Sequence, residues 1–208
     1  DHRGFTGDWQ DPEGKRTFTV NLPNIVPDVW LGSWQRTFIG FDGLPKYSLH
    51  ESATIEFYNP TARTVAFDFW AFSGAHLGHV TGIADRTAHG VVFTDHENQS
   101  TIVFDSNGDV LIVSEENTWL YGGVGVSFGG TYHRSEWDIG EPTLLDYGVF
   151  PEPKLDAAFL ELVGKNYYEQ FLHSFHIMEF REDLDGLGAV VVDGWVRGLA
   201  GIMFGRIM

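Results

Sequence analysis

The chain contains no cysteine, so it can form neither a disulfide bond nor a catalytic thiolate. It also has no run of about 18 apolar residues, which argues against a membrane-spanning helix. Basic residues are few, because 13 Lys and Arg stand against 29 Asp and Glu and give a formal net charge of −16. This balance argues against a nucleic-acid-binding patch and against attraction to an anionic membrane surface.

Several motifs that carry chemistry are also absent. The sequence has no Walker phosphate loop, no dinucleotide fingerprint and no HExxH metal motif. His76 with His79, and His173 with His176, have HxxH spacing, which would favour chelation on a helix. No recognised metal motif surrounds either pair, so we predict no metal site. We also predict no catalytic residues and no cofactor.

Alternation of apolar and polar residues is the main positive signal. Aromatic residues make up 15% of the chain and glycines number 25, which suits a β protein with many turns. Period-two patterns predict strands over residues 29–41, 52–58, 64–72, 79–84, 90–94, 101–104, 110–113 and 124–133. Asn107-Gly108 predicts a hairpin turn rather than a calcium loop, because Val110 occupies the position at which that loop needs glycine.

These patterns divide the chain into three segments. Residues 1–134 are predicted to form an antiparallel β-barrel or a strongly twisted meander, and residues 135–153 a proline-rich linker. Residues 154–208 are predicted to form an α/β appendage, with a helix over 155–175 that Gly164 weakens and strands over 189–192 and 195–208. The apolar C-terminal edge indicates a possible homo-oligomer. The fold class is therefore mainly β.

The segment from Ile55 to Arg134 resembles a β-rich domain of poorly characterised secreted or periplasmic bacterial proteins. That domain ends in Cys-Gly-Gly-x-x-Val-Ser-Phe-x-Gly-x-Tyr-x-Arg/Lys, and residues 121–134 here read YGGVGVSFGGTYHR. Tyr121 replaces the motif cysteine, and Ser100 or a neighbour replaces an upstream cysteine, so both are missing together. The resemblance implies a small lipocalin-like or inhibitor-like barrel and a secreted or periplasmic location. It implies no catalytic residue.

The candidate ligand-binding residues are aromatic or titratable side chains of the β region. Tryptophan suits such sites because it is apolar with one polar group. Asp68 would be a buried carboxylate if its face of the strand pointed inward, but Val65, Phe67 and Phe69 make the better core face, which favours the outward orientation. The predicted set is Trp30, Trp34, Asp68, Trp70, His76, His79 and Tyr132.

Three functions remain open from the sequence. The first is a non-catalytic binding protein, with a barrel pocket for an apolar or aromatic small molecule or an inhibitor-like surface for a protein partner. The second is an enzyme in which Asp68 and His76 or His79 act as acid and base at the barrel mouth. The third is a structural or self-assembling protein. The expected partners are a small molecule or a protein, with no nucleic acid and no membrane span.

Overall fold

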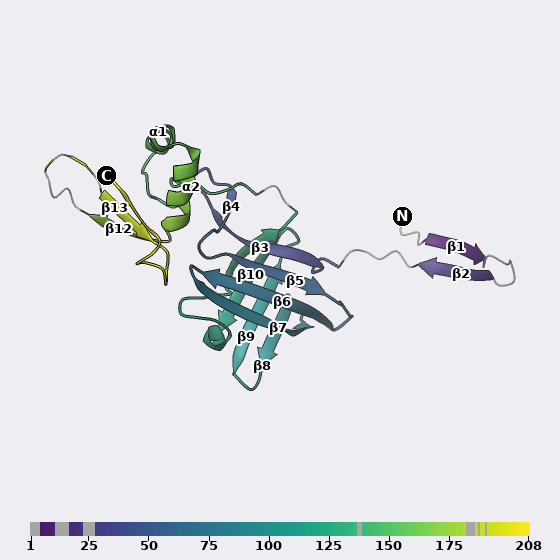
Figure 1. The fold of residues 1–208 in the computed structure, drawn as a ribbon. Coiled ribbons are helices and arrows are strands. Elements are labelled where there is room, and N and C mark those ends of the chain that lie inside the picture. The colour runs from purple at the N-terminus through teal and green to yellow at the C-terminus, as the bar shows by residue number, and fades with distance from the viewer. Residues whose placement is uncertain are drawn as a thin grey trace.

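The fold is mainly β, at 45% strand and 14% helix. The computed structural model describes residues 5–10, 17–22, 28–136, 139–181, 186, 188–189 and 191–208. An antiparallel barrel forms the centre of the molecule, and two helices and a small sheet lie at one side of it (Figure 1). The predicted combination of an antiparallel barrel and a C-terminal α/β part is confirmed.

Eight strands close the barrel in the order β3-β5-β6-β7-β8-β9-β10-β11, and β11 pairs back with β3. Every pairing is antiparallel, so the chain meanders up and down around the barrel. The ninth strand, β4 (Pro45–Tyr47), pairs with the far end of β3. The barrel strands are β3 (Gly32–Ile39), β5 (Ala53–Tyr58), β6 (Thr64–Ser73), β7 (His76–Arg86), β8 (Val91–Asp95), β9 (Ser100–Ser106), β10 (Val110–Glu116) and β11 (Gly130–Arg134).

Alternation along the strands decides which side chains enter the barrel. On β6 the side chains of Val65, Phe67, Phe69 and Ala71 are fully buried, as the sequence pattern predicts. The opposite face of β6, which carries Asp68, points away from the core. Burying an aliphatic or aromatic side chain contributes about 1.5–3 kcal/mol, so this inward row contributes strongly to the stability of the barrel.

The predicted closing strand is too long. The period-two pattern runs from residue 124 to residue 133, but β11 begins only at Gly130. Gly125 has φ +80°, which breaks an extended chain, and the Val124 side chain is 77% exposed. Residues 122–129 therefore form a loop at the barrel rim, and a carboxylate on β10 holds it.

That carboxylate belongs to Glu115, which the sequence alone would place on a solvated surface. It accepts hydrogen bonds from the Ser127 hydroxyl at 2.5 Å and from the Phe128 backbone N–H at 3.0 Å, and Thr118 donates a third. Burial raises the pKa of Glu115, but these hydrogen bonds outweigh burial and leave the pKa below its usual value. The loop and the strand are thereby tied together.

The C-terminal part has its own core. Helices α1 (Pro153–Val163) and α2 (Lys165–Ser174) are separated at Gly164, which has φ +78°, so the predicted break is confirmed. Strands β12 (Ile177–Arg181), β13 (Val191–Trp195) and β14 (Phe204–Ile207) form an antiparallel sheet, of which the sequence analysis missed β12 and overextended the last strand. The buried apolar side chains of this core are Leu144, Val149, Tyr168, Leu172, Phe175, Val192 and Ile207.

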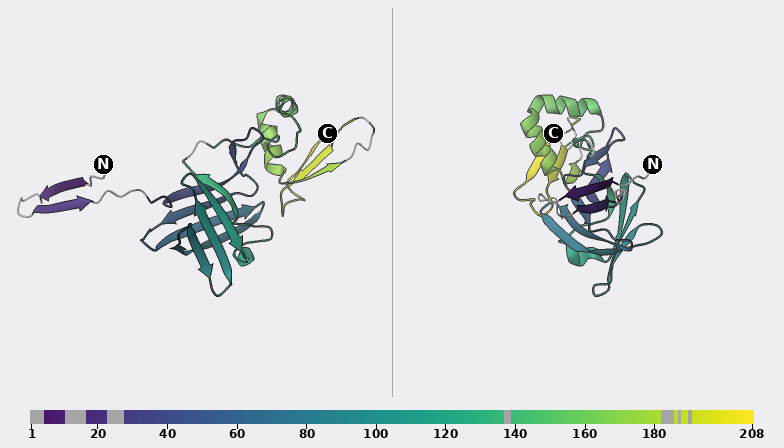
Figure 2. Two further views of the ribbon diagram at one scale, coloured as in Figure 1. Left: turned by 180° about the vertical axis from the view of Figure 1, so that it is seen from behind. Right: turned by 90° about the vertical axis from the view of Figure 1, so that its right-hand side faces the viewer.

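Two of those core side chains, Leu144 and Val149, come from the segment 135–153 that we expected to be a linker. At the other end of the chain, β1 (Phe5–Gln10) and β2 (Thr17–Leu22) pair with each other as a separate sheet. Figure 2 shows this hairpin and the C-terminal part on opposite sides of the barrel. No helix in the described part of the chain is long and apolar enough to cross a membrane.

Candidate functional site

Aromatic rings occupy the barrel interior, where the sequence analysis expected a ligand. Phe57 and Phe67 pack against Phe104 with ring centroids 5.2 and 5.3 Å apart, and Phe69 packs against Phe128 at 4.9 Å. All five side chains are at most 2% exposed. Rings at these separations and edge-on angles stabilise one another as well as excluding water. The barrel is therefore built as a packed core.

Two predicted ligand-binding tryptophans belong to this core. Trp34 is fully buried, and the Arg134 guanidinium lies 4.5 Å from the centre of its ring. Trp30 is 7% exposed and packs edge-on against Phe57 at 5.7 Å. The geometry gives both residues a packing role at one end of the barrel.

Tyr132 is also buried, and it belongs to a polar network inside the barrel. Its hydroxyl donates to the Phe128 carbonyl at 2.7 Å and accepts from Arg36 Nε at 3.2 Å. Arg36 in turn donates to the carbonyls of Glu51 and Ser127. Burial raises the pKa of Tyr132, so the phenol stays protonated. This network holds the rim loop and the β4–β5 connection to the barrel wall.

Asp68, Trp70 and His79 come together on the outer wall of the barrel. Asp68 Oδ1 lies 2.5 Å from His79 Nε2, and Trp70 Nε1 donates to Asp68 Oδ2 at 3.3 Å. The Trp70 and His79 rings stack with centroids 3.9 Å apart. The strand register explains the contact, because Trp70 is directly opposite His79 and Asp68 is two residues along the same face. The cluster lies on the wall and not at the barrel mouth.

We predict that Asp68→Asn changes the free energy of unfolding by less than about 0.5 kcal/mol, because exposed ion pairs contribute little. Both side chains of the Asp68–His79 pair are more than a third exposed. Urea unfolding of the two proteins at neutral pH measures the difference. A loss of several kcal/mol would show that the outer wall is buried against something in solution.

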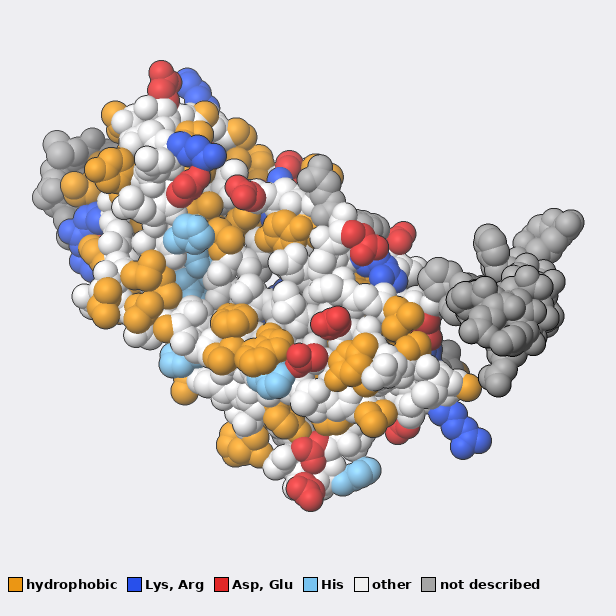
Figure 3. Space-filling view, turned by 45° about the vertical axis from the view of Figure 1, so that its right-hand side comes forward, with side chains coloured by type: hydrophobic (Ala, Val, Ile, Leu, Met, Phe, Trp, Pro, Cys, Tyr) orange, Lys and Arg blue, Asp and Glu red, His pale blue; other side chains and the backbone are white. Residues whose placement is uncertain are grey.

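A cluster of titratable side chains lies where the C-terminal part meets the barrel (Figure 3). The imidazoles of His50 and His176 stack face to face, with centroids 5.2 Å apart and planes 3° apart. The Tyr147 ring packs on His50 at 4.8 Å. Burial, and then the charges of His176 and His173, lower the pKa of His50 to about 4, so the ring is neutral at physiological pH.

His76 lies near this junction, away from the Asp68 cluster. It is half-buried beside Gly123 and Gly198, and a Cβ built on Gly198 would be 3.1 Å from His76 Nε2. His173 is on α2, whereas His176 follows the end of that helix, so the HxxH pair does not share a helix face. Among the described residues, no group of three or more potential ligands is placed to hold a metal ion.

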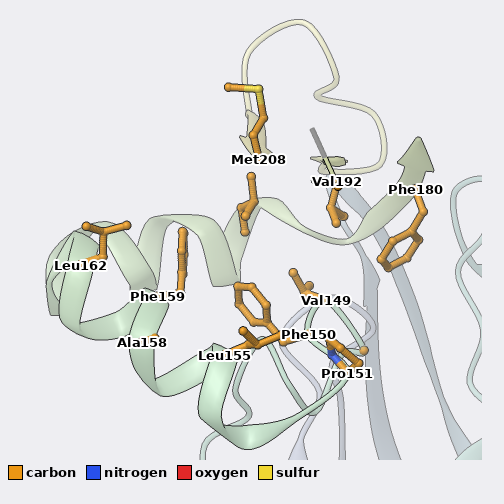
Figure 4. Close-up of a pocket in the computed structure, with 13 residues that line it drawn as sticks. Val149, Phe150, Pro151, Leu155, Ala158, Phe159, Leu162, Phe180, Val192 and Met208 are labelled. Carbon is orange, nitrogen blue, oxygen red and sulfur yellow. The ribbon is translucent and has the colours of Figure 1, made fainter. Parts of the chain in front are cut away.

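The clearest pocket is an apolar groove between α1 and the small sheet, with a volume of about 610 Å³. Figure 4 shows helix side chains along one wall, Val149, Phe150 and Pro151 along another, and Phe180 and Val192 from the sheet. Within the part of the chain that the structure describes, the lining contains no charged and no hydrogen-bonding side chain. The lining residues are Gly148, Val149, Phe150, Pro151, Leu155, Ala158, Phe159, Leu162, Phe180, Gly188, Val192, Ile207 and Met208.

Helix α1 has an apolar stripe that the described residues leave largely exposed. Leu155, Ala158, Phe159 and Leu162 recur at helical spacing and line the groove, yet no residue of α1 is buried. Leu162 is 81% exposed. Short helices depend on tertiary packing of their apolar face for most of their stability. A further apolar group bound in the groove would therefore cover the stripe and stabilise the helix.

Sequence reasoning found this stripe but interpreted it as a packing face. The other wall comes from segments up to about 50 residues away, and only the tertiary structure shows that they enclose a space. His50 carries no pattern that distinguishes it from a surface histidine. Neither the groove nor the histidine cluster was among the predicted sites.

Comparison with known proteins gives no relative. No family model, no curated protein and no solved structure matches the chain. Ser100, one candidate for the upstream cysteine position, donates to the Asn117 carbonyl at 2.7 Å. Tyr121 also donates to Asp95 at 2.5 Å. The function of the protein is therefore inferred from the geometry of the chain itself.

Proposed function

We propose that the protein binds an apolar small molecule in the groove between α1 and the small sheet. The observation that carries this proposal is the uncovered apolar stripe of α1 beside a cavity of about 610 Å³. Small-molecule pockets have volumes of roughly 300–1,000 Å³ and mostly apolar linings. This proposal keeps the binding role expected from the sequence and moves the pocket outside the barrel.

The composition of the lining limits the ligand. No side chain among the described lining residues can pair with an ion or direct a hydrogen bond, so the enclosed part of the ligand is a hydrocarbon or an unsubstituted aromatic body. A charged group on the ligand would have to stay in solvent at the mouth. The net charge of −16 disfavours an anionic ligand further. A neutral, extended apolar molecule fits both conditions.

Titration with N-phenyl-naphthylamine, a neutral probe that fluoresces in apolar surroundings, tests the proposal. Ala158→Trp places a large side chain in the groove, and we expect it to weaken the probe affinity by about tenfold or more, equivalent to about 1.4 kcal/mol. Ala157→Trp is the matched control, because Ala157 is exposed on the same helix but does not line the groove. It should bind the probe as the unsubstituted protein does.

Two results would contradict the proposal. One is the absence of saturable probe binding by the unsubstituted protein. The other is equal affinity of the Ala158→Trp and Ala157→Trp variants. Probe binding that disappears as the protein concentration rises, together with a doubled mass by light scattering, would show that a second copy of the chain covers the groove instead.

A further inference from the structure

A second cavity, of about 340 Å³, lies at the junction between the barrel and the C-terminal part. Unlike the groove at α1, it combines aromatic rings with polar and charged groups. Its walls come from the β3 end, the β4–β5 connection, the segment before α1, the end of α2 and the turn after β13. The lining residues are Phe38, Ser48, His50, Glu51, Tyr147, Phe175, His176, Met178 and Arg197.

Arg197 is the unusual member of this lining. Its half-buried guanidinium forms no ion pair and no hydrogen bond with the described residues, and its Nε atom is buried without a partner. Other buried or half-buried arginines have acceptors: Arg86 contacts Asp28, and Arg36 donates to the Glu51 and Ser127 carbonyls. Because a buried charge without a partner is costly, a half-buried arginine without any acceptor among the described residues is an unfilled position.

The backbone holds Arg197 in place. Its carbonyl accepts a hydrogen bond from the Ala75 N–H at 3.1 Å, and its own N–H donates to His176 Nδ1 at 3.4 Å. The guanidinium packs against Gly125, where a built Cβ would be 3.0 Å from the Arg197 Nη1 atom. These contacts restrain the backbone and one edge of the guanidinium of a residue that lines the cavity, which lowers the entropic cost of binding.

The remaining walls favour a flat body. His50 and His176 present parallel imidazoles, and the Phe38 and Tyr147 rings stack at 5.2 Å with 21° between their planes. His50 is 8% exposed, and its Nε2 atom also has no hydrogen-bond partner among the described residues. Glu51 adds one carboxylate, 3.9 Å from His176 Nε2, which disfavours a ligand with two negative charges.

We propose that this junction cavity binds a small aromatic monocarboxylate. The carboxylate pairs with the Arg197 guanidinium, whose planar donors match two carboxylate oxygens. The ring of the ligand lies among the aromatic and imidazole walls. This site is separate from the apolar groove and requires ligand chemistry that the groove excludes.

Benzoate is the probe for this site, and benzyl alcohol is its uncharged counterpart. We expect benzoate to bind saturably at millimolar or lower concentration by calorimetry and to shift the imidazole NMR signals of His50 and His176. Benzyl alcohol should bind at least about tenfold more weakly, because it lacks the carboxylate. These measurements need no variant. Equal binding of the two probes, or no saturable binding of benzoate, would overturn the proposal.

Substitutions then locate the carboxylate. Arg197→Gln should weaken benzoate about tenfold or more, whereas Arg197→Lys retains the charge and should recover part of the affinity. Arg63→Gln, at an exposed position outside the cavity, is the control and should have no effect. Unchanged benzoate affinity in Arg197→Gln would contradict the assignment. Binding of N-phenyl-naphthylamine should be the same in all three variants. The proposal for this cavity is therefore tested independently of the proposal for the groove at α1.

Discussion

Phe104→Ala should destabilise the protein by about 3–5 kcal/mol, the range for removing a buried phenylalanine side chain. Phe104 is fully buried, and its ring packs against Phe57, Phe67 and Phe69 with centroids 5.2 to 6.1 Å apart. Removing it leaves a cavity at the centre of the barrel that closed strands cannot collapse to fill. Urea unfolding followed by tryptophan fluorescence measures the loss.

Val103→Ala is the matched control for this result. Val103 is the neighbouring residue on β9, points away from the core and is 37% exposed. It should cost less than about 1 kcal/mol, because most of the removed surface already faces water. Similar losses for the two variants would mean that the Phe104 ring does not occupy a packed interior, and the barrel could then hold a ligand as first expected.

The free energy of unfolding should fall by about 3 kcal/mol as the pH is lowered from about 6.5 to about 4 because of His50. The pKa of His50 is about 4 in the folded protein, against 6.5 for an ordinary histidine. Between these values the unfolded chain binds a proton that the folded protein does not, so stability decreases with decreasing pH. Each pKa unit corresponds to about 1.4 kcal/mol.

His50→Phe tests the origin of this slope, because phenylalanine keeps a flat ring in the stack but cannot be protonated. The decrease in stability between pH 6.5 and 4 should be smaller in this variant, and His176, whose pKa burial also lowers, accounts for part of what remains. His89→Phe, at an exposed histidine, should leave the slope unchanged. Parallel pH profiles for His50→Phe and the unsubstituted protein would contradict the assignment.

Local sequence pattern was sufficient to predict most of the barrel. Strands such as β6 alternate strictly between core and solvent, and Asn107-Gly108 forms the expected hairpin turn, with the Asn107 N–H donating to the Val110 carbonyl at 3.2 Å. The pattern failed at residues 124–129, where glycine conformations and the half-buried Glu115 carboxylate override the alternation. Neither influence is visible in a period-two pattern.

Predicting the candidate sites requires information that a local sequence pattern does not contain. Asp68 and Trp70 share a face by alternation alone, but their contact with His79 required the register between β6 and β7. The groove required the relative placement of α1, the segment before it and three strands. The junction cavity required the pairing of His50 with His176, which are far apart in the sequence and close only in the fold.

Methyl NMR during titration with N-phenyl-naphthylamine tests the central claim most directly, because it reports where the apolar ligand binds. Leu155 and Leu162 line the groove, whereas Ile55 and Ile102 are fully buried in the barrel. We expect saturable shifts of the two groove leucines and unchanged signals of the two barrel isoleucines. Shifts of the barrel isoleucines with unchanged groove leucines would contradict this claim and place the ligand inside the barrel.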